Sequence, residues 1–276
     1  MEKIVVDLKQ VQETLLLPLW GRAVETRKPR PLLTDTRAVE IMDSLSYDFS
    51  RIARNTRALT RLAWIGRALL TDTISKQFLS KYPDAAFVNM GCGLDTNFER
   101  IDNGKLWWYD IDLPEVIDLR KKFFRETERR KFIASSLTDY GWMEPLKTHK
   151  HILFVAAGVM YYFDENAVKE ILVKMAETFP GCEFLLDVAS PTGVKVANKV
   201  VIRNTGMDDK SILKWGLSNP SEIETWSSMI NVERQYSFFT DIRKKLLWRE
   251  MAWSYFSDYL KIMYMIHLDF RAGAST

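Results

Sequence analysis

Cysteine and histidine are scarce in this chain of 276 residues, which has two of the first and three of the second. Two cysteines cannot staple a small disulfide scaffold, and neither belongs to a CxxC or HxxxH pattern, so we expect no metal site. Neither sign of charge dominates, because 39 Lys and Arg face 36 Asp and Glu, a net charge of +3. That balance gives no reason to expect a nucleic-acid partner.

Long apolar runs are also missing. The longest, residues 152–163, is too short to span a bilayer. The first 20 residues are interrupted by charges and lack the apolar core and cleavage site of a signal peptide. We therefore expect a cytoplasmic protein with reduced thiols and no membrane partner.

The composition is that of a globular protein, with 47% hydrophobic and 12% aromatic residues, including nine tryptophans. This length and composition suit one large domain, residues 1–276. Apolar residues recur every three to four positions before Pro83, which predicts a long helix ending near Tyr82. Residues 1–84 are thus expected to be a helical N-terminal part.

Short apolar strands alternate with helices from residue 85 to 189. The expected strands are 86–90, 106–109, 131–134, 152–156 and 183–188. This alternation predicts an α/β fold with a parallel, Rossmann-like sheet covered on both faces. Residues 231–276 read as strand, helix (about 241–261) and strand, and the period of two in residues 264–271 predicts a half-buried antiparallel strand.

A glycine turn follows the first of these strands. Gly91, Cys92 and Gly93 allow a sharp turn and a close approach of a ligand to the backbone. Thr96 stands where a dinucleotide fingerprint would have a third glycine, and with Glu99 it has the spacing of a capping box. The alternative is an ordinary tight turn without a ligand.

Two acids end the second strand, about twenty residues after the glycines. A carboxylate at this tip can accept hydrogen bonds from both ribose hydroxyls of an adenosine-type cofactor. We expect that role for Asp112, while Asp110 caps a helix or holds the loop. The alternative is that both acids are solvated loop residues or charges at a helix N-terminus.

Together these segments resemble the leucine carboxyl methyltransferase family. The most specific matches are VNMGCGLDT (88–96) and YDIDLPEV (109–116), within a similarity that covers roughly residues 15–190. Further matches are LLLPLWGRA (15–23), Arg67, Ser135–Leu137 with Trp142, VAAGVMYYF (155–163) and Phe179–Gly181.

The resemblance implies the seven-stranded sheet of class I S-adenosylmethionine (SAM) methyltransferases, with the last strand antiparallel. It also implies a helical lid (1–84), a cofactor-binding core (85–189) and a substrate-lid insert (190–230). Arg67 would pair with the SAM carboxylate, and Asp112 would hold the ribose. The implied cofactor-binding set is Arg67, Gly91, Cys92, Gly93, Asp112, Leu113, Ser136, Leu137 and Ala157.

The chain departs from the family at two of these positions. Many members have a glutamate where this chain has Ala157, and another has an acid in the adenine loop where this chain has Ser136. Both changes remove possible polar contacts to SAM.

The substrate side is less specific. Tyr161 and Tyr162 follow the fourth strand and could line the methyl site or pack in the core. Arg203 and Trp215 in the insert suit an acidic, flat molecule, or belong to a solvated lid. No general base is assigned, because His149 and His151 lie at the far end of the sheet and His267 alternates outward on the last strand.

The sequence therefore predicts a SAM-dependent O-methyltransferase acting on a carboxylate or hydroxyl of a small metabolite. A carboxylate is already a nucleophile at neutral pH and needs no base, whereas a hydroxyl would more often require one. The alternatives are methylation of a protein C-terminal carboxylate, a SAM-binding protein without catalysis, and a nicotinamide-dependent oxidoreductase.

Overall fold

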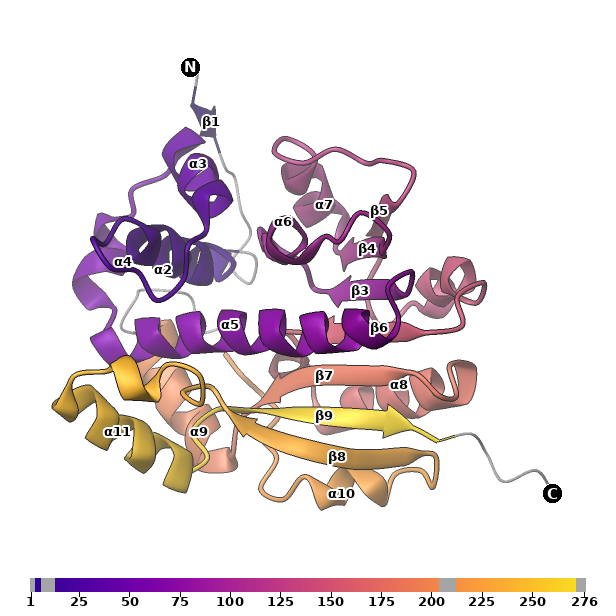
Figure 1. Ribbon diagram of the computed structural model, residues 1–276. Coiled ribbons are helices and arrows are strands. Elements are labelled where there is room, and N and C mark those ends of the chain that lie inside the picture. The colour runs from indigo at the N-terminus through magenta and orange to yellow at the C-terminus, as the bar shows by residue number, and fades with distance from the viewer. Residues whose placement is uncertain (1–2, 6–12, 204–211, 272–276) are drawn as a thin grey trace.

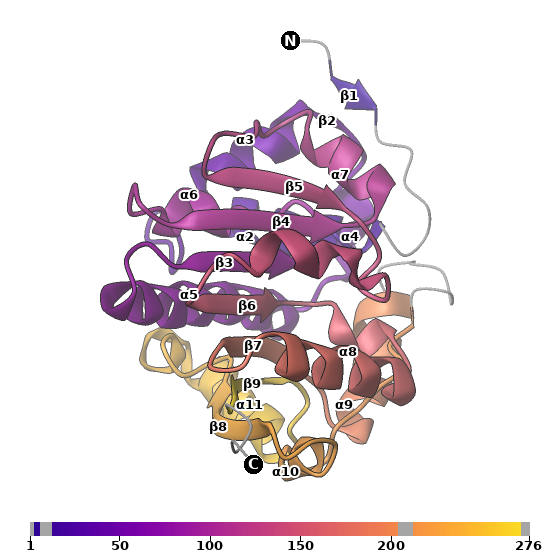
Figure 2. The same ribbon diagram turned by 90° about the vertical axis from the view of Figure 1, so that its right-hand side faces the viewer.

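A seven-stranded sheet forms the centre of the computed structural model, which describes residues 3–5, 13–203 and 212–271 (Figure 1). The strand order is β5-β4-β3-β6-β7-β9-β8, and the strands follow one another in this order from top to bottom in Figure 2. Their bounds are β3 Ala86–Met90, β4 Trp107–Asp112, β5 Arg130–Ala134, β6 Ile152–Ala156, β7 Glu183–Val188, β8 Ile230–Ser237 and β9 Tyr264–Phe270.

Only β9 runs against its neighbours in this sheet. It pairs antiparallel with both β7 and β8, whereas the pairs from β5 to β7 are parallel. Every residue of β3 and β6 is buried, as expected for strands covered on both faces. The predicted α/β sheet with an antiparallel last strand is confirmed. The expectation that this strand is half-buried is wrong, because β9 lies inside the sheet with β8 at its edge and six of its seven residues are buried.

Helices cover both faces of the sheet. The helices that precede it are α2 Leu16–Thr26, α3 Thr36–Ser44, α4 Ser50–Asn55 and α5 Ala58–Lys81, and a short parallel pair joins β1 Ile4–Val5 to β2 Leu45–Ser46. Within and after the sheet come α6 Asn97–Ile101, α7 Pro114–Arg120, η1 Tyr140–Leu146, η2 Met160–Tyr162, α8 Glu165–Thr178, α9 Pro191–Ala197, the π-helical η3 Asn198–Arg203, α10 Ser221–Glu224, η5 Arg243–Lys245 and α11 Trp248–Tyr259. No helix among the described residues is long and apolar enough to cross a membrane.

The long helix α5 crosses one face of the sheet (Figure 1). Its C-terminal half packs Ile74 and Phe78 against residues of β3 and β6, and it ends just before Pro83, as predicted. Gly66 lets the chain after β8 approach closely, since a Cβ there would lie 1.9 Å from the Phe238 carbonyl oxygen. The N-terminal half of α5 extends past the strands and faces the cavity described below.

A second apolar layer lies on the opposite face. There α8 buries Val168, Ile171, Leu172 and Met175, its side chains spaced at helical intervals, in one cluster with residues of β3, β6 and β7. The predicted helix at 241–261 is shorter than expected, because Arg243–Lys245 forms a separate turn before α11.

Candidate active site

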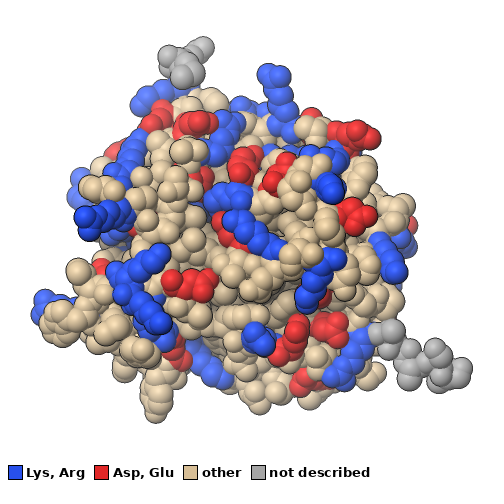
Figure 3. Space-filling view, viewed as in Figure 1, with Lys and Arg blue, Asp and Glu red and all other residues tan. Residues whose placement is uncertain are grey.

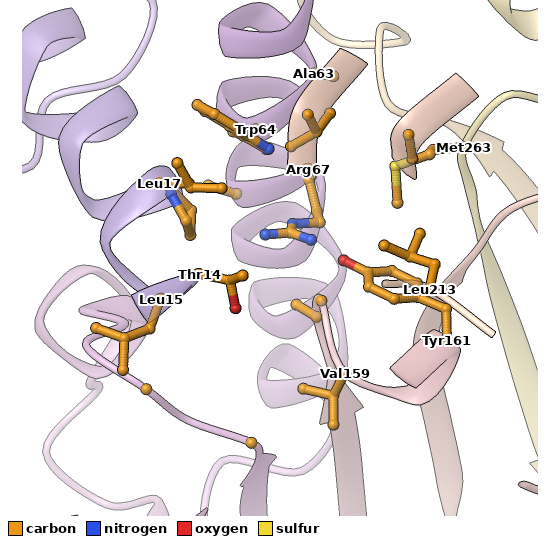
Figure 4. Close-up of a pocket in the computed structure, with 18 of the residues that line it drawn as sticks. Thr14, Leu15, Leu17, Ala63, Trp64, Arg67, Val159, Tyr161, Leu213 and Met263 are labelled. Atoms are coloured by element: carbon orange, nitrogen blue, oxygen red, sulfur yellow. The ribbon is translucent and has the colours of Figure 1, made fainter. Parts of the chain in front are cut away.

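A cavity of about 600 Å³ opens where the parallel strands end at their carboxyl termini (Figure 4). In sheets of this kind ligands bind at this edge. The sheet contributes the glycine turn, the tip of β4 and the segment after β6, while α2, α5, α9, η3 and α11 supply the other walls. The lining is mostly apolar, and it includes Leu15, Leu17, Ala63, Trp64, Val159, Leu213 and Met263.

The glycine turn requires its glycines for two separate reasons. Gly91 and Gly93 have φ angles of +63° and +46°, a region that residues with a Cβ adopt rarely. A Cβ on Gly91 would also lie 2.2 Å from Cγ2 of Val159. Between them Cys92 is buried, and burial raises the pKa of its thiol well above the usual value, so it is protonated and unreactive.

Arg120 stabilises this turn through hydrogen bonds to its backbone, and no signal in the sequence marked it for this role. Its fully buried guanidinium donates to the carbonyl oxygens of Gly93 (3.0 Å) and Asp95 (2.9 Å). It also pairs with Asp110 at 2.9 Å, and Asp110 accepts a further hydrogen bond from Asn89. Asp110 therefore has the loop-holding role that its position suggested.

Asp112 faces the cavity with half of its hydrogen-bonding capacity in use. One carboxylate oxygen accepts from the Gly93 N–H and the other from the Leu113 N–H, both at 2.8 Å. A carboxylate has about four acceptor sites, so two remain for hydroxyl donors. Burial raises the pKa of Asp112 to about 6, with the two N–H donors opposing that shift.

Buried ion pairs connect the N-terminal helices to the glycine turn. Arg22 of α2 pairs with Asp35 at 2.9 Å and donates to the Leu94 carbonyl oxygen at 3.0 Å. Arg100 of α6 pairs with the same Asp35 at 2.9 Å and with Asp72 of α5 at 2.7 Å. No sequence signal marked these residues, because arginines in amphipathic helices are usually solvated.

The predicted cap at Thr96 is wrong. Its hydroxyl makes no capping bond to α6 and donates instead to the buried carboxylate of Asp35. Thr96 thus adds to the ion-paired connection between the N-terminal helices and the turn.

Arg67 of α5 borders the cavity, and its Nη1 lies 2.6 Å from an Asp187 carboxylate oxygen (Figure 4). The other oxygen of Asp187 accepts from the Gly158 N–H at 2.7 Å. Burial would lower the pKa of Arg67, but Asp187 and Tyr161 together outweigh that effect and raise the pKa, so the guanidinium stays charged. The Tyr161 hydroxyl points toward this guanidinium.

Comparison with known proteins decides the family. The model of the leucine carboxyl methyltransferase family matches residues 16–176. The chain is 31% identical over 250 residues to the tetracenomycin polyketide synthesis O-methyltransferase TcmP of Streptomyces glaucescens, covering 88% of this chain and 90% of that protein. The chain belongs to the leucine carboxyl methyltransferase family.

More distant relatives agree with this assignment. A SAM-dependent methyltransferase, dpfgK, of Gibberella zeae is 26% identical over 247 residues, with 82% of this chain and 81% of that protein covered. A candidate methyltransferase of Thermobifida fusca is 12% identical, covers 95% of both chains and superposes with a TM-score of 0.61. The fold is therefore that of class I methyltransferases, and the cofactor of this methyltransferase is SAM.

All nine residues expected to bind the cofactor line the cavity, including the two that depart from the family. The Ser136 hydroxyl lies 2.8 Å from the Thr138 hydroxyl oxygen. Leu137 is fixed because its carbonyl accepts from Trp142 Nε1 at 3.2 Å. Ala157 presents no polar side chain, and the carboxylate bound to the backbone of the next residue, Asp187, accepts hydrogen bonds from the Gly158 N–H and from Arg67.

On the substrate side, two of four expected residues line the cavity. Tyr161 and Tyr162 do so, and burial raises the pKa of both phenols, so that they are neutral at physiological pH. The expectation that Trp215 lines the substrate pocket is wrong. Its side chain is buried in the main core, with its ring centroid 6.2 Å from that of Trp226. Arg203 is exposed and does not line the cavity, whereas Ile202 just before it does.

The three histidines lie outside the cavity lining. His149 contacts the Tyr109 hydroxyl at 2.8 Å, and His151 stacks on Tyr82 with centroids 3.9 Å apart. The outward orientation expected for His267 is wrong, because Nε2 of this buried residue lies 2.8 Å from Glu183 of the neighbouring strand.

Proposed function

We propose that this enzyme transfers the SAM methyl group to an oxygen of a small molecule, with a carboxylate as the favoured acceptor and a hydroxyl as the alternative. The observation that carries the proposal is one continuous cavity that joins the glycine turn and Asp112 to apolar walls from α5, α9 and α11. Its volume of about 600 Å³ is in the range of small-molecule sites. TcmP, the relative at 31% identity, is named as a polyketide O-methyltransferase.

The lining residues fit the cofactor. The turn at Gly91 brings bare backbone to the cavity, and Asp112 keeps two acceptor sites that match the two ribose hydroxyls. Arg67 forms an ion pair with Asp187 through Nη1 and also borders the cavity. There its remaining N–H groups can pair with the amino-acid carboxylate of SAM. When bound, SAM supplies an electrophilic methyl group on a sulfonium.

The protein contributes to methyl transfer by positioning the acceptor and by excluding water from the site. The apolar walls exclude water, which leaves an acceptor oxygen less solvated and more nucleophilic. Alignment of the acceptor with the methyl group converts a bimolecular reaction into an effectively unimolecular one. No histidine is found among the described lining residues, and the neutral Tyr161 phenol can donate a hydrogen bond to the acceptor but is a poor base.

We also propose which segments form the lid over the cavity, from the residues that line it. Helices of residues 1–84 and the described parts of 190–230 form opposite walls, through residues such as Leu17, Trp64, Val196 and Leu213. The strand-helix-strand part, 231–276, adds a third wall through α11. In this proposal substrate enters between these walls.

Transfer of a labelled methyl group tests the proposal. The enzyme is incubated with methyl-labelled SAM and, in parallel, a small-molecule extract or a peptide pool. We expect label in the small-molecule fraction, released by mild base if the product is an ester and retained if it is an ether. Label only in peptides would assign the protein C-terminal carboxylate instead, and no transfer despite tight SAM binding would favour a non-catalytic SAM-binding protein.

A further inference from the structure

The helix α11 carries an aromatic face that is largely exposed in the described part of the chain. Six large side chains of this helix are exposed, from 37% for Met251 to 84% for Tyr259. The serines Ser254 and Ser257 are the buried residues of the helix. This reverses the usual arrangement of a surface helix, whose apolar side faces the core. The aromatic face comprises Trp248, Met251, Trp253, Tyr255, Phe256 and Tyr259.

Four cations (Arg243, Lys244, Lys245 and Arg249) and three acids (Asp241, Glu250 and Asp258) border this face. Lys244, Lys245 and Arg249 are exposed. Asp258 is paired with Arg243, and Glu250 accepts from the Leu247 N–H at 3.0 Å. In Figure 3 the lower left of the molecule, where Figure 1 places α11, shows uncharged surface with Lys and Arg, and fewer Asp and Glu, at its margins. The surface around the aromatic face is therefore positive and complements an anionic partner.

A second copy of the chain fits this face poorly. A symmetric dimer through α11 would bring the cations of the two copies toward each other. The helix has 12 residues, a length of roughly 18 Å. One such helix face supplies only part of the about 800 Å² per partner that a stable interface buries.

We propose that α11 docks the protein on an anionic lipid bilayer, with the aromatic face in the interface and Lys244, Lys245 and Arg249 at the headgroups. Tryptophan and tyrosine rings suit this environment, since one part of each ring is apolar and the other polar. Helices that lie in a membrane interface combine such a face with basic residues. This proposal revises the expectation that the protein has no membrane partner.

Docking would set the cavity at the bilayer. Trp253 and Phe256 of the aromatic face also line the cavity, together with Leu260 just after the helix. An apolar molecule dissolved in the membrane could thus pass along α11 into the site. The docking itself requires neither SAM nor an acceptor, so its test is independent of the proposed methyl transfer.

Vesicle sedimentation of the full-length protein tests the proposal. We expect binding to phosphatidylcholine vesicles that contain phosphatidylglycerol, at least about tenfold weaker binding to phosphatidylcholine alone, and loss of binding at high salt. Trp248→Ser/Tyr259→Ser and Lys244→Glu/Lys245→Glu should each weaken binding at least about tenfold. The matched reversal Lys121→Glu/Lys122→Glu, at the end of α7, should leave binding unchanged, and so should Trp248→Tyr/Tyr259→Trp.

Three results would overturn the proposal. The first is equal sedimentation with neutral and anionic vesicles. The second is equal binding by all variants, with circular dichroism confirming that they are folded. The third is a dimer in analytical ultracentrifugation that Trp248→Ser/Tyr259→Ser dissociates, without vesicle binding by the wild type, which would assign the face to a second copy.

Discussion

The Gly93 N–H donates a 2.8 Å hydrogen bond to the Asp112 carboxylate, and this bond joins the glycine turn to the tip of the neighbouring strand. The two segments are separated by 19 positions in the sequence. The same carboxylate faces the cavity. The backbone of the turn thereby orients the group that we assign to the ribose, and it leaves that group two acceptor sites for the hydroxyls.

Replacing Asp112 by Asn should weaken binding of S-adenosylhomocysteine. The substitution removes the charge that strengthens the ribose hydrogen bonds, at a cost of about 2 kcal/mol, roughly thirtyfold in affinity. Isothermal calorimetry at pH 7.5 measures the change. Asp118→Asn, on an exposed position of α7, is the matched control. An unchanged affinity of a folded Asp112→Asn protein would remove the ribose assignment.

The affinity for S-adenosylhomocysteine should also fall as the pH drops below about 6. The pKa of Asp112 is raised to about 6 by burial, and the ribose hydroxyls donate to the ionised form, so ligand and proton compete. We expect about tenfold weaker binding per pH unit until the lower pKa of the complex is reached. Without ligand the sign is opposite for folding, because a raised carboxyl pKa favours the folded protein at low pH, and this contribution is lost as the pH rises through 6.

The pH series needs Asp112→Asn as its control. That variant has no titratable group at this position. Its affinity for S-adenosylhomocysteine should therefore change less with pH than that of the wild type between about pH 5 and pH 7, the range that brackets the pKa of Asp112. A wild-type profile that is flat, or one that the variant reproduces, would show that Asp112 does not accept hydrogen bonds from the ligand in its ionised form.

Gly91→Ala should lower stability and ligand binding more than Gly181→Ala, a substitution at another glycine with positive φ. Gly91 and Gly181 both have positive φ, but a Cβ at Gly181 has nothing within 4 Å, whereas at Gly91 it meets Val159 at 2.2 Å. We expect each variant to lose about 1 kcal/mol of unfolding free energy from strain. Gly91→Ala should lose at least about 1 kcal/mol more, along with most S-adenosylhomocysteine binding. Denaturant unfolding and calorimetry measure both, and equal behaviour of the two variants would contradict the close approach.

Asp187→Asn should destabilise the folded protein. It leaves Arg67, whose side chain is 10% exposed, without its charged partner, and removal of one member of a buried pair costs about 3 kcal/mol. Urea unfolding measures the loss. The exposed pair Lys147–Glu144 offers the control, since Glu144→Gln should change stability by less than about 0.5 kcal/mol. If Asp187→Asn lowered the free energy of unfolding by less than about 1 kcal/mol, the charge of Arg67 would be stabilised by groups in the cavity and not by Asp187.

The parts of the fold that depend on local pattern were predictable. Strand β3 and the turn at Gly91 were found because burial, periodicity and glycine chemistry act over a few consecutive residues. The ion-paired cluster of Arg22, Asp35 and Arg100 was not, since Arg100 lies 65 positions after Asp35 in the sequence and only the tertiary fold brings them together. Trp215 was misplaced for a related reason, because an aromatic residue in an insert can face a ligand or the core, and only packing decides.

The assignment of the cavity to SAM can be tested by calorimetric titration of the wild-type enzyme with S-adenosylhomocysteine and, separately, with NAD. We expect saturable binding of S-adenosylhomocysteine that Asp112→Asn weakens, and no binding of NAD. Binding of NAD without binding of S-adenosylhomocysteine would contradict the assignment of the cavity beside Gly91 to SAM.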